Sequence, residues 1–308
     1  MGLVNVIIAL VCAPFLISLI NKTKAYFAGR QGPMWLQPYY DLWKLLHKGA
    51  VYSRTTSWIF QAGPMIVLAC MFTALLLTPL GQVPALLAFP GDIIVFAYVL
   101  ALARFALIPM ALDTGSAFEG MGASREAIFS TLTEPALILG LAAVAHETHK
   151  LSLTEMHLAA NFSTWTNSIL VLAIVTSSLL IVFLAENARI PVDDPETHLE
   201  LTMIHEVMIL DNSGPDLAYL QYAQALKIWV LGSLLQALFL PGGVNLGIPI
   251  LDIPLSWIVH LLGLAVLTVG TGVVESGMAR LRMPRVPQLL LGATALSALA
   301  LVLGKWSP

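Results

Sequence analysis

The sequence predicts an all-α, polytopic integral membrane protein with about eight transmembrane helices and one amphipathic helix on the cytoplasmic side. Of its 308 residues, 58% are hydrophobic and 11% are charged, whereas a soluble domain carries about 25% charged residues. The mean hydropathy is +0.84. Apolar segments of about 20 residues, the length that crosses a bilayer as a helix, recur along the chain. We therefore treat 1–308 as a single membrane domain.

The apolar segments predict spans over 3–20, 60–80, 92–112, 126–146, 167–187, 221–241, 254–277 and 286–304. Two loops between them are long, 21–58 and the acidic loop 188–220. Within the first, the segment 33–48 is too polar to span. Its apolar side chains recur at helical spacing, namely Trp35, Leu36, Tyr39, Leu42, Trp43 and Leu46. This pattern is typical of an amphipathic helix that lies in the membrane interface.

Basic residues set the expected orientation, because Lys and Arg are enriched in cytoplasmic loops. One side of the membrane would hold Lys22, Lys24, Arg30, Lys44, Lys48, Arg54, Arg125, Arg189, Lys227, Arg280, Arg282 and Arg285. The opposite side would hold Lys150 and Lys305. The sequence therefore predicts that both termini lie on the outer side and that the acidic loop is cytoplasmic.

Charge and cysteine content exclude several classes of function. The net charge of −3 gives no indication of a nucleic-acid partner. Cys12 and Cys70 both lie in apolar runs, which argues against a disulfide framework or a metal site. The chain has no Cys-x-x-Cys motif, so any iron–sulfur clusters would belong to other chains.

Ionisable residues inside the predicted spans are candidates for function, because a charge in a bilayer normally has a partner or a task. Arg104 and Glu134 lie deep in two spans, and Glu186 and Glu275 lie at the cytoplasmic ends of two others. Pro135, directly after Glu134, removes a helical hydrogen bond and adds local polarity. Either these carboxyls carry protons, or Arg104 and Glu134 form a structural ion pair between two helices.

The acidic loop is the second candidate, since residues 185–212 contain seven of the 18 acidic residues. Asp193, Glu196 and Glu200 are spaced to share one helical face. The loop also contains Asp194, His198, His205 and Glu206. Neighbouring carboxyls titrate as a coupled group, and histidines titrate near neutrality. A solvated acidic surface is the simpler interpretation, and the histidine spacing matches no zinc motif.

Five stretches together resemble one family. R-x-P-x-D-x-P-E-x-x-x-E-L, from Arg189 to Leu201, resembles the signature loop of the quinone-chamber membrane subunit of respiratory complex I. GRQGPMWLQPYYDLWKLL (29–46) resembles that subunit's first cytoplasmic loop and amphipathic helix. The segments 102–137, with LDTGS, GASREA and EP, and 275–282, ESGMARLR, are more similar to the corresponding subunit of formate hydrogenlyase and other group 4 membrane-bound NiFe hydrogenases. DNSG (211–214) resembles the end of the loop.

The resemblance implies a subunit of the prokaryotic inner membrane that joins a cytoplasmic redox arm to ion-pumping subunits. Its proton path would comprise Glu134, Glu186, Asp193, Asp194, Glu196, His198, Glu200, Glu206 and Glu275, with Arg104 as a buried charge partner. Its docking surface for the redox arm would comprise Arg30, Gln31, Gly32, Arg125 and Arg189. The chain departs from the family pattern at His198, where a carboxylate is usual, and in the apparent length of 200–213.

The resemblance also implies partners and cofactors. The partners would be hydrogenase-like large and small subunits, a ferredoxin-like iron–sulfur subunit, antiporter-like membrane subunits and the lipid bilayer. The NiFe centre and the iron–sulfur clusters would sit on those partners, and this chain would have no catalytic residue of its own. A quinone-binding subunit of an NADH-quinone oxidoreductase-like complex is the alternative, with quinone beneath 29–46. A stand-alone transporter is a third interpretation, although the chain lacks an inverted repeat.

Overall fold

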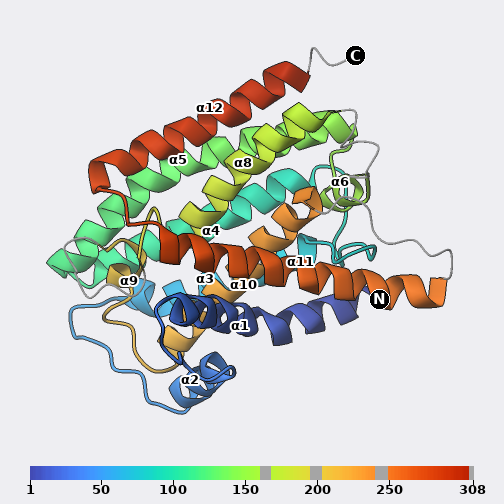
Figure 1. The fold of residues 1–308 in the computed structure, drawn as a ribbon. Coiled ribbons are helices and arrows are strands. Elements are labelled where there is room, and N and C mark those ends of the chain that lie inside the picture. Colours follow the sequence, from blue (N-terminus) through green and yellow to red (C-terminus); the bar gives the residue numbers. More distant parts are fainter. Residues whose placement is uncertain (160–167, 195–202, 240–248, 305–308) are drawn as a thin grey trace.

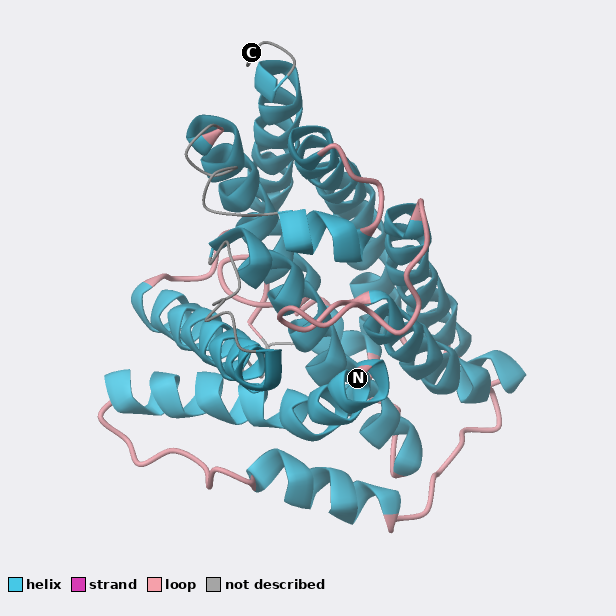
Figure 2. Ribbon diagram, turned by 90° about the vertical axis from the view of Figure 1, so that its right-hand side faces the viewer, coloured by secondary structure: helices cyan, strands magenta, loops and turns pink. Residues whose placement is uncertain are grey.

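The computed structural model describes residues 1–159, 168–194, 203–239 and 249–304. These residues form helices linked by loops and contain no β-strand (Figures 1 and 2). The helices are α1 (Gly2–Phe27), α2 (Gln37–Leu46), α3 (Trp58–Leu77), α4 (Asp92–Asp113), α5 (Ala117–Thr148), α6 (Leu153–Ala159), α8 (Ile169–Glu186), α9 (His205–Met208), α10 (Pro215–Phe239), α11 (Pro249–Gly277) and α12 (Val286–Gly304), with a 3-10 turn at Met283–Arg285. The all-α fold is as predicted.

Seven helical segments within the described residues are long and apolar enough to cross a membrane. They are α1, α3, α4, α5, α8, α11 from Asp252 and the segment Met283–Gly304 that contains α12. The protein is therefore a multi-pass membrane protein. The eighth expected span, α10, is 25 residues long but is not among them. Its sequence is more polar because it includes Gln221, Gln224, Lys227 and Gln236.

The polar helix α10 is an interior helix, which explains how it tolerates these residues. It packs against α1, α2, α3, α6, α8 and α11, and Figure 1 shows it behind α1 and α11. Its apolar side chains are nearly inaccessible, with Leu226 at 0% and Trp229 at 1% exposure. Because α10 faces protein rather than lipid, its polar side chains can find partners within the chain.

On the other side of the molecule, α5, α8 and α12 pack closely through small residues. Ser178 Oγ and Ser297 Oγ lie 2.7 Å apart, and Ser297 Oγ donates to the Ala136 carbonyl at 2.9 Å. A Cβ at Gly140 would lie 2.8 Å from Leu179 Cδ2, so glycine is needed for this approach. These three helices form a rigid layer that holds Glu134 and Glu186 at fixed positions.

Two differences from the predicted elements affect the site. Helix α5 begins at Ala117 rather than near 126, so residues 125 and 126 lie in its third turn instead of at its start. The amphipathic segment forms a shorter helix, α2, at the same end of the molecule as α9 (Figure 1). The ends of α1 and α12 nearest the chain termini lie toward the opposite end, where α6 lies. Which side of the membrane they occupy stays a prediction.

Candidate functional site

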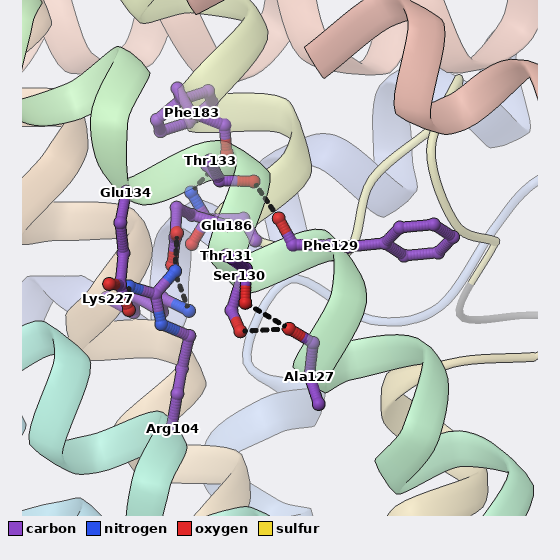
Figure 3. Close-up of polar contacts among 11 residues, drawn as sticks. Arg104, Ala127, Phe129, Ser130, Thr131, Thr133, Glu134, Phe183, Glu186 and Lys227 are labelled. Atoms are coloured by element: carbon purple, nitrogen blue, oxygen red, sulfur yellow. Dashed lines mark hydrogen bonds and ion pairs between the residues drawn. The ribbon is translucent and has the colours of Figure 1, made fainter. Parts of the chain in front are cut away.

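Arg104 of α4 lies at the centre of a group of ionisable side chains between four helices. Its side chain is 5% exposed, and its Nη2 atom is 2.8 Å from Glu134 Oε1 of α5. Its Nη1 atom forms an ion pair with Glu186 Oε1 of α8. Figure 3 shows Arg104 pointing between the two carboxylates. The ion pair between Arg104 and Glu134 that the sequence suggested is therefore present, and Glu186 is a second partner.

Glu186 also contacts a second cation that the sequence analysis assigned only to a loop end. Lys227 Nζ of α10 lies 2.8 Å from Glu186 Oε2, and the lysine side chain is 15% exposed. The Glu186 side chain itself is 2% exposed. Removing a carboxylate this deeply from water is costly unless cations compensate it. The two cations provide that compensation, so Glu186 is the anionic anchor of the group.

Glu126 is a third carboxyl at this site, and the sequence analysis missed it. It lines two cavities together with Arg104 and Glu186. Ser130 and Thr133, one and two turns further along α5, line the smaller of these cavities with it. The i, i+4, i+7 spacing from Glu126 was the available signal for a shared face. The expected start of the span at 126 hid it, because a residue at a helix end needs no buried partner.

We call Arg104, Lys227, Glu126, Glu134 and Glu186 the Arg104 cluster. It contains three carboxyls and two cations. If all five groups were ionised, the cluster would carry one negative charge in excess. An excess charge that is held away from water is unfavourable, and coupled carboxyls avoid it by retaining a proton between them. The composition of the cluster therefore suits it to hold and exchange a proton.

Three cavities adjoin the cluster and the loop that follows α8. The first, about 40 Å³, lies between α3, α4 and α10 and includes Arg104, Glu126, Glu186 and Lys227 in its lining. The second, about 20 Å³, shares Arg104, Glu126 and Glu186 with the first and extends to Asp193. A cavity of about 10–15 Å³ of this kind is enough for one water molecule. Both cavities are polar and large enough to hold water.

The third cavity is larger, about 230 Å³, and lies beneath α2. Polar side chains from four segments line it, including Asn21, Gln37, Asp41, Arg189, Glu206 and Gln221. Apolar side chains, among them Ile17 and Leu42, form the rest of its wall. We call this space the large cavity and the 40 Å³ space the cluster cavity. The large cavity opens beside the predicted docking loop, on the side of the molecule where α2 and α9 lie.

Asp193 fixes the turn that leads into α9. Its side chain is 2% exposed and pairs with Arg280 Nη2 at 3.0 Å. One of its oxygens accepts the backbone N–H groups of Ile204 at 3.1 Å and His205 at 3.0 Å. Burial raises the pKa of Asp193, and these N–H groups and Arg280 oppose that rise. Asp193 therefore joins the two ends of the acidic loop, a positioning role that the sequence did not predict.

His205 and Glu206 are adjacent in α9 but face different cavities. His205 lines the cluster cavity and Glu206 lines the large cavity. Burial, with the nearby cations Lys227 and Arg189, lowers the pKa of His205 to about 4. Burial, and next the Asp193 charge, raises the pKa of Glu206 to about 7, against the effect of Arg189. At neutral pH His205 is therefore neutral, and Glu206 exchanges protons.

A family model described as NADH dehydrogenase matches residues 1–304. The chain belongs to the NADH dehydrogenase family. It is 31% identical over 304 residues to hydrogenase-4 component C of Escherichia coli (strain K12), covering 98% of this chain and 94% of that protein. It is 29% identical over 303 residues to formate hydrogenlyase subunit 4 of the same organism, covering 97% and 96% of the two chains.

Two further similarities extend the comparison. An NADH-quinone oxidoreductase membrane chain of Rubrobacter xylanophilus is 28% identical over 245 residues, which cover 76% of this chain and 71% of that one. A chain in the structure of a membrane-bound sulfane sulfur reductase, an archaeal respiratory membrane complex, superposes with a TM-score of 0.84. That chain is 22% identical, with 98% of both chains covered. The structural similarity shows a common fold.

In this NADH dehydrogenase family member, Glu275 lies apart from the Arg104 cluster. Its fully inaccessible side chain is 3.1 Å from Lys24 Nζ and 3.4 Å from Arg189 Nη1. We call these three residues the Glu275 group. Arg189 is 4% exposed, so it does not present a cation to a docking partner, and its predicted place on the docking surface is wrong. It instead links α11 to the start of the acidic loop.

The other predicted docking residues divide into two sets. Arg30, Gln31 and Gly32 are exposed on the loop after α1, and Lys22 Nζ donates to the Gln31 carbonyl at 2.9 Å. Arg125 is half-buried and donates to the Met203 carbonyl at 2.8 Å. Arg125 thus braces the acidic loop from α5, whereas 30–32 form an accessible surface.

Four predicted residues of the acidic loop remain to be placed. Asp194 is half-buried beside Asp193. Glu196, His198 and Glu200 lie outside the described residues, so their part in a proton path stays a prediction. Within the ranges that the structure describes, no group of three or more His, Cys, Asp or Glu residues is arranged to hold a metal ion.

Proposed function

We propose that this chain is the membrane-anchoring, energy-coupling subunit of a complex I-like hydrogenase complex. Its relatives with hydrogenase and formate hydrogenlyase names match it over nearly its full length. In this proposal a cytoplasmic redox arm rests on the end that carries α2 and α9, and both termini lie on the outer side. Hydrogenase-like large and small subunits and a ferredoxin-like subunit would hold the NiFe centre and the iron–sulfur clusters. Antiporter-like subunits would adjoin the chain within the membrane.

The observation that carries the coupling role is the composition of the Arg104 cluster. Three carboxyls share two cations beside cavities of water-molecule size. The cluster holds one proton at rest and passes it on when a neighbouring charge changes. Asp193 borders the cluster through the 20 Å³ cavity, and Glu206 borders the large cavity. Protons are preferred to Na⁺ here because each carboxylate contact to Arg104 and Lys227 is already a charged pair.

Glu134 provides the exit from the cluster. Its side chain is 40% exposed although the residue lies in the middle of α5. A carboxyl facing lipid in a helix centre costs at least about 2.5–3.5 kcal/mol. Covering it with a neighbouring membrane subunit avoids that cost and places the next proton acceptor within reach. We therefore assign the α4–α5 face around Glu134 to an antiporter-like partner.

The test is Glu134→Gln in the whole complex, reconstituted in sealed vesicles, with protons moved per electron as the readout. We expect normal assembly, because Arg104 keeps Glu186, and coupled turnover reduced about tenfold, the lower range of a lost proton-transfer group. Glu155→Gln is the matched control, since Glu155 is also a half-exposed carboxylate with one basic partner, Lys150 at 3.4 Å. Normal proton movement in a correctly assembled Glu134→Gln complex would contradict the proposal.

A quinone-binding role is the second candidate, and the large cavity beneath α2 is the observation in its favour. Ligand pockets for molecules of drug size span about 300–1,000 Å³ and are mostly apolar. The large cavity is smaller, at about 230 Å³, and contains Asp41, Arg189 and Glu206. A photoreactive quinone analogue that labels residues 37–42 in the intact complex would favour this second role. Labelling confined to partner chains would favour the first.

A further inference from the structure

The large cavity and the cluster cavity are separate spaces with one described residue in common. Gln224 of α10 lines both of them. The remaining described residues that line the large cavity do not line the cluster cavity. Gln224 therefore stands in the wall between the space that adjoins the docking side and the space that contains Arg104, Glu126 and Glu186.

The residues around Gln224 form a polar stripe along α10. Gln221, one turn earlier, lines the large cavity, and Lys227, one turn later, lines the cluster cavity. The three side chains are spaced at i, i+3 and i+6 and are half-buried, so they follow one face of the helix. The stripe thus runs from the large cavity, past Gln224, to the lysine that contacts Glu186 at 2.8 Å.

Helix α9 contributes to the same wall from the opposite direction. Glu206 lines the large cavity and His205 lines the cluster cavity. The Asp193 carboxylate accepts the N–H groups of Ile204 and His205 and so fixes where α9 lies. A proton leaving Glu206 must cross this wall to reach the cluster. The carboxyl and imidazole groups face opposite cavities, which leaves the Gln224 amide as the polar group that borders both.

We propose that Gln224 is a positioning residue that orients water molecules across this wall and so connects the large cavity to the Arg104 cluster. A primary amide offers two N–H donors and a carbonyl acceptor. It can donate to a water on one side and accept from a water on the other. The amide does not itself take up the proton, which moves along the ordered waters. This inference rests on the proposed proton-transfer function and assigns its entry point.

The test compares variants of the whole complex in sealed vesicles. Gln224→Met keeps similar length and removes the amide, and we expect coupled turnover to fall about tenfold, as for loss of a proton-transfer element. We also expect its solvent deuterium isotope effect on turnover to rise. Gln224→Glu keeps hydrogen-bonding atoms and should retain at least about half of the wild-type turnover. Gln221→Met, one turn away and confined to the large cavity, is the matched control and should behave as wild type.

Three outcomes would overturn the inference. They are wild-type turnover in Gln224→Met, an equal loss in Gln221→Met, or no rescue by Gln224→Glu in an assembled complex. The glutamate variant decides the matter even where the methionine variant fails to assemble. Normal turnover in Gln224→Met beside a defective Glu134→Gln would remove this entry point alone. Normal proton movement in Glu134→Gln would instead remove the proposed function.

Discussion

The Arg104 cluster and the Glu275 group are both buried sets of ionic side chains, yet their compositions are opposite. In the first, three carboxyls share two cations, and cavities adjoin them. In the second, one carboxylate contacts two cations at 3.1 and 3.4 Å, with no exposed carboxylate surface. An excess of carboxyls favours a retained proton, whereas an excess of cations holds the carboxylate ionised. Charge composition, rather than burial, distinguishes a proton carrier from a structural link.

The largest expected effect breaks the structural member of this comparison. Glu275→Gln removes the carboxylate that Lys24 and Arg189 share. Removing one partner of a buried ion pair costs about 3–5 kcal/mol, so we expect a clear loss in the unfolding free energy and in yield. Chemical denaturation of the purified complex measures it. Protons moved per electron should be unchanged in the fraction that assembles, and a changed ratio would place Glu275 in the path.

The second prediction addresses the carrier. Glu126→Gln removes the excess carboxyl of the Arg104 cluster while leaving Glu134 and Glu186, the ion-pair partners of Arg104, in place. We expect coupled turnover to fall about tenfold, with a change in unfolding free energy within about 1 kcal/mol because neither of these ion pairs is broken. Vesicle assays and denaturation measure the two quantities on the same preparation. A loss of stability as large as that of Glu275→Gln would make Glu126 a structural residue instead.

The third prediction concerns pH and Glu206, whose pKa is raised from 4.5 to about 7. The folded chain then binds more protons than the unfolded chain between these values, so the unfolding free energy falls as pH rises from about 4.5 to 7. Coupled turnover should also decline above about pH 7, where Glu206 no longer supplies a proton. Glu206→Gln should remove both pH dependences. Profiles identical to those of the wild type would show that another group titrates.

The smallest expected effect is at the docking surface. Arg30 is exposed, and an exposed charge contributes little by itself and is screened by salt. Arg30→Ala should weaken binding of the redox arm a few-fold at low ionic strength, with a smaller difference at high salt. Co-purification over a salt series measures this, with Arg54→Ala as an exposed basic control in the same cytoplasmic loop. Equal retention of the redox arm at every salt concentration would exclude a docking role for Arg30.

The sequence predicted much of the fold because hydropathy directly reports contact with lipid. It predicted α10 as an ordinary span, although α10 is a polar interior helix, since a helix surrounded by protein is not required to be apolar. Arg104, Glu134 and Glu186 could be recognised because a charge stands out within an apolar run. Glu126 and Lys227 could not, because each lies near an apparent helix end where charge is expected.

The remaining parts of the site depend on packing between distant segments. The place of Gln224 between two cavities follows from how α2, α3, α4 and α9 meet α10, and no spacing along the chain indicates it. Arg189 fits a basic loop motif in sequence but is turned inward to Glu275 in three dimensions. Asp193 looked like one of several surface acids, yet its backbone partners lie 11 and 12 residues further along the chain.

The most direct test of the account is whether the Arg104 cluster holds a proton. Infrared spectroscopy of the purified complex detects the C=O stretch of a protonated carboxyl, and difference spectra between wild type and variants assign it. We predict that Glu126→Gln and Glu134→Gln each abolish the same band, because either change leaves two carboxyls for two cations, and that Glu275→Gln leaves it intact. A band that persists in both of the first two variants would contradict a shared proton in this cluster.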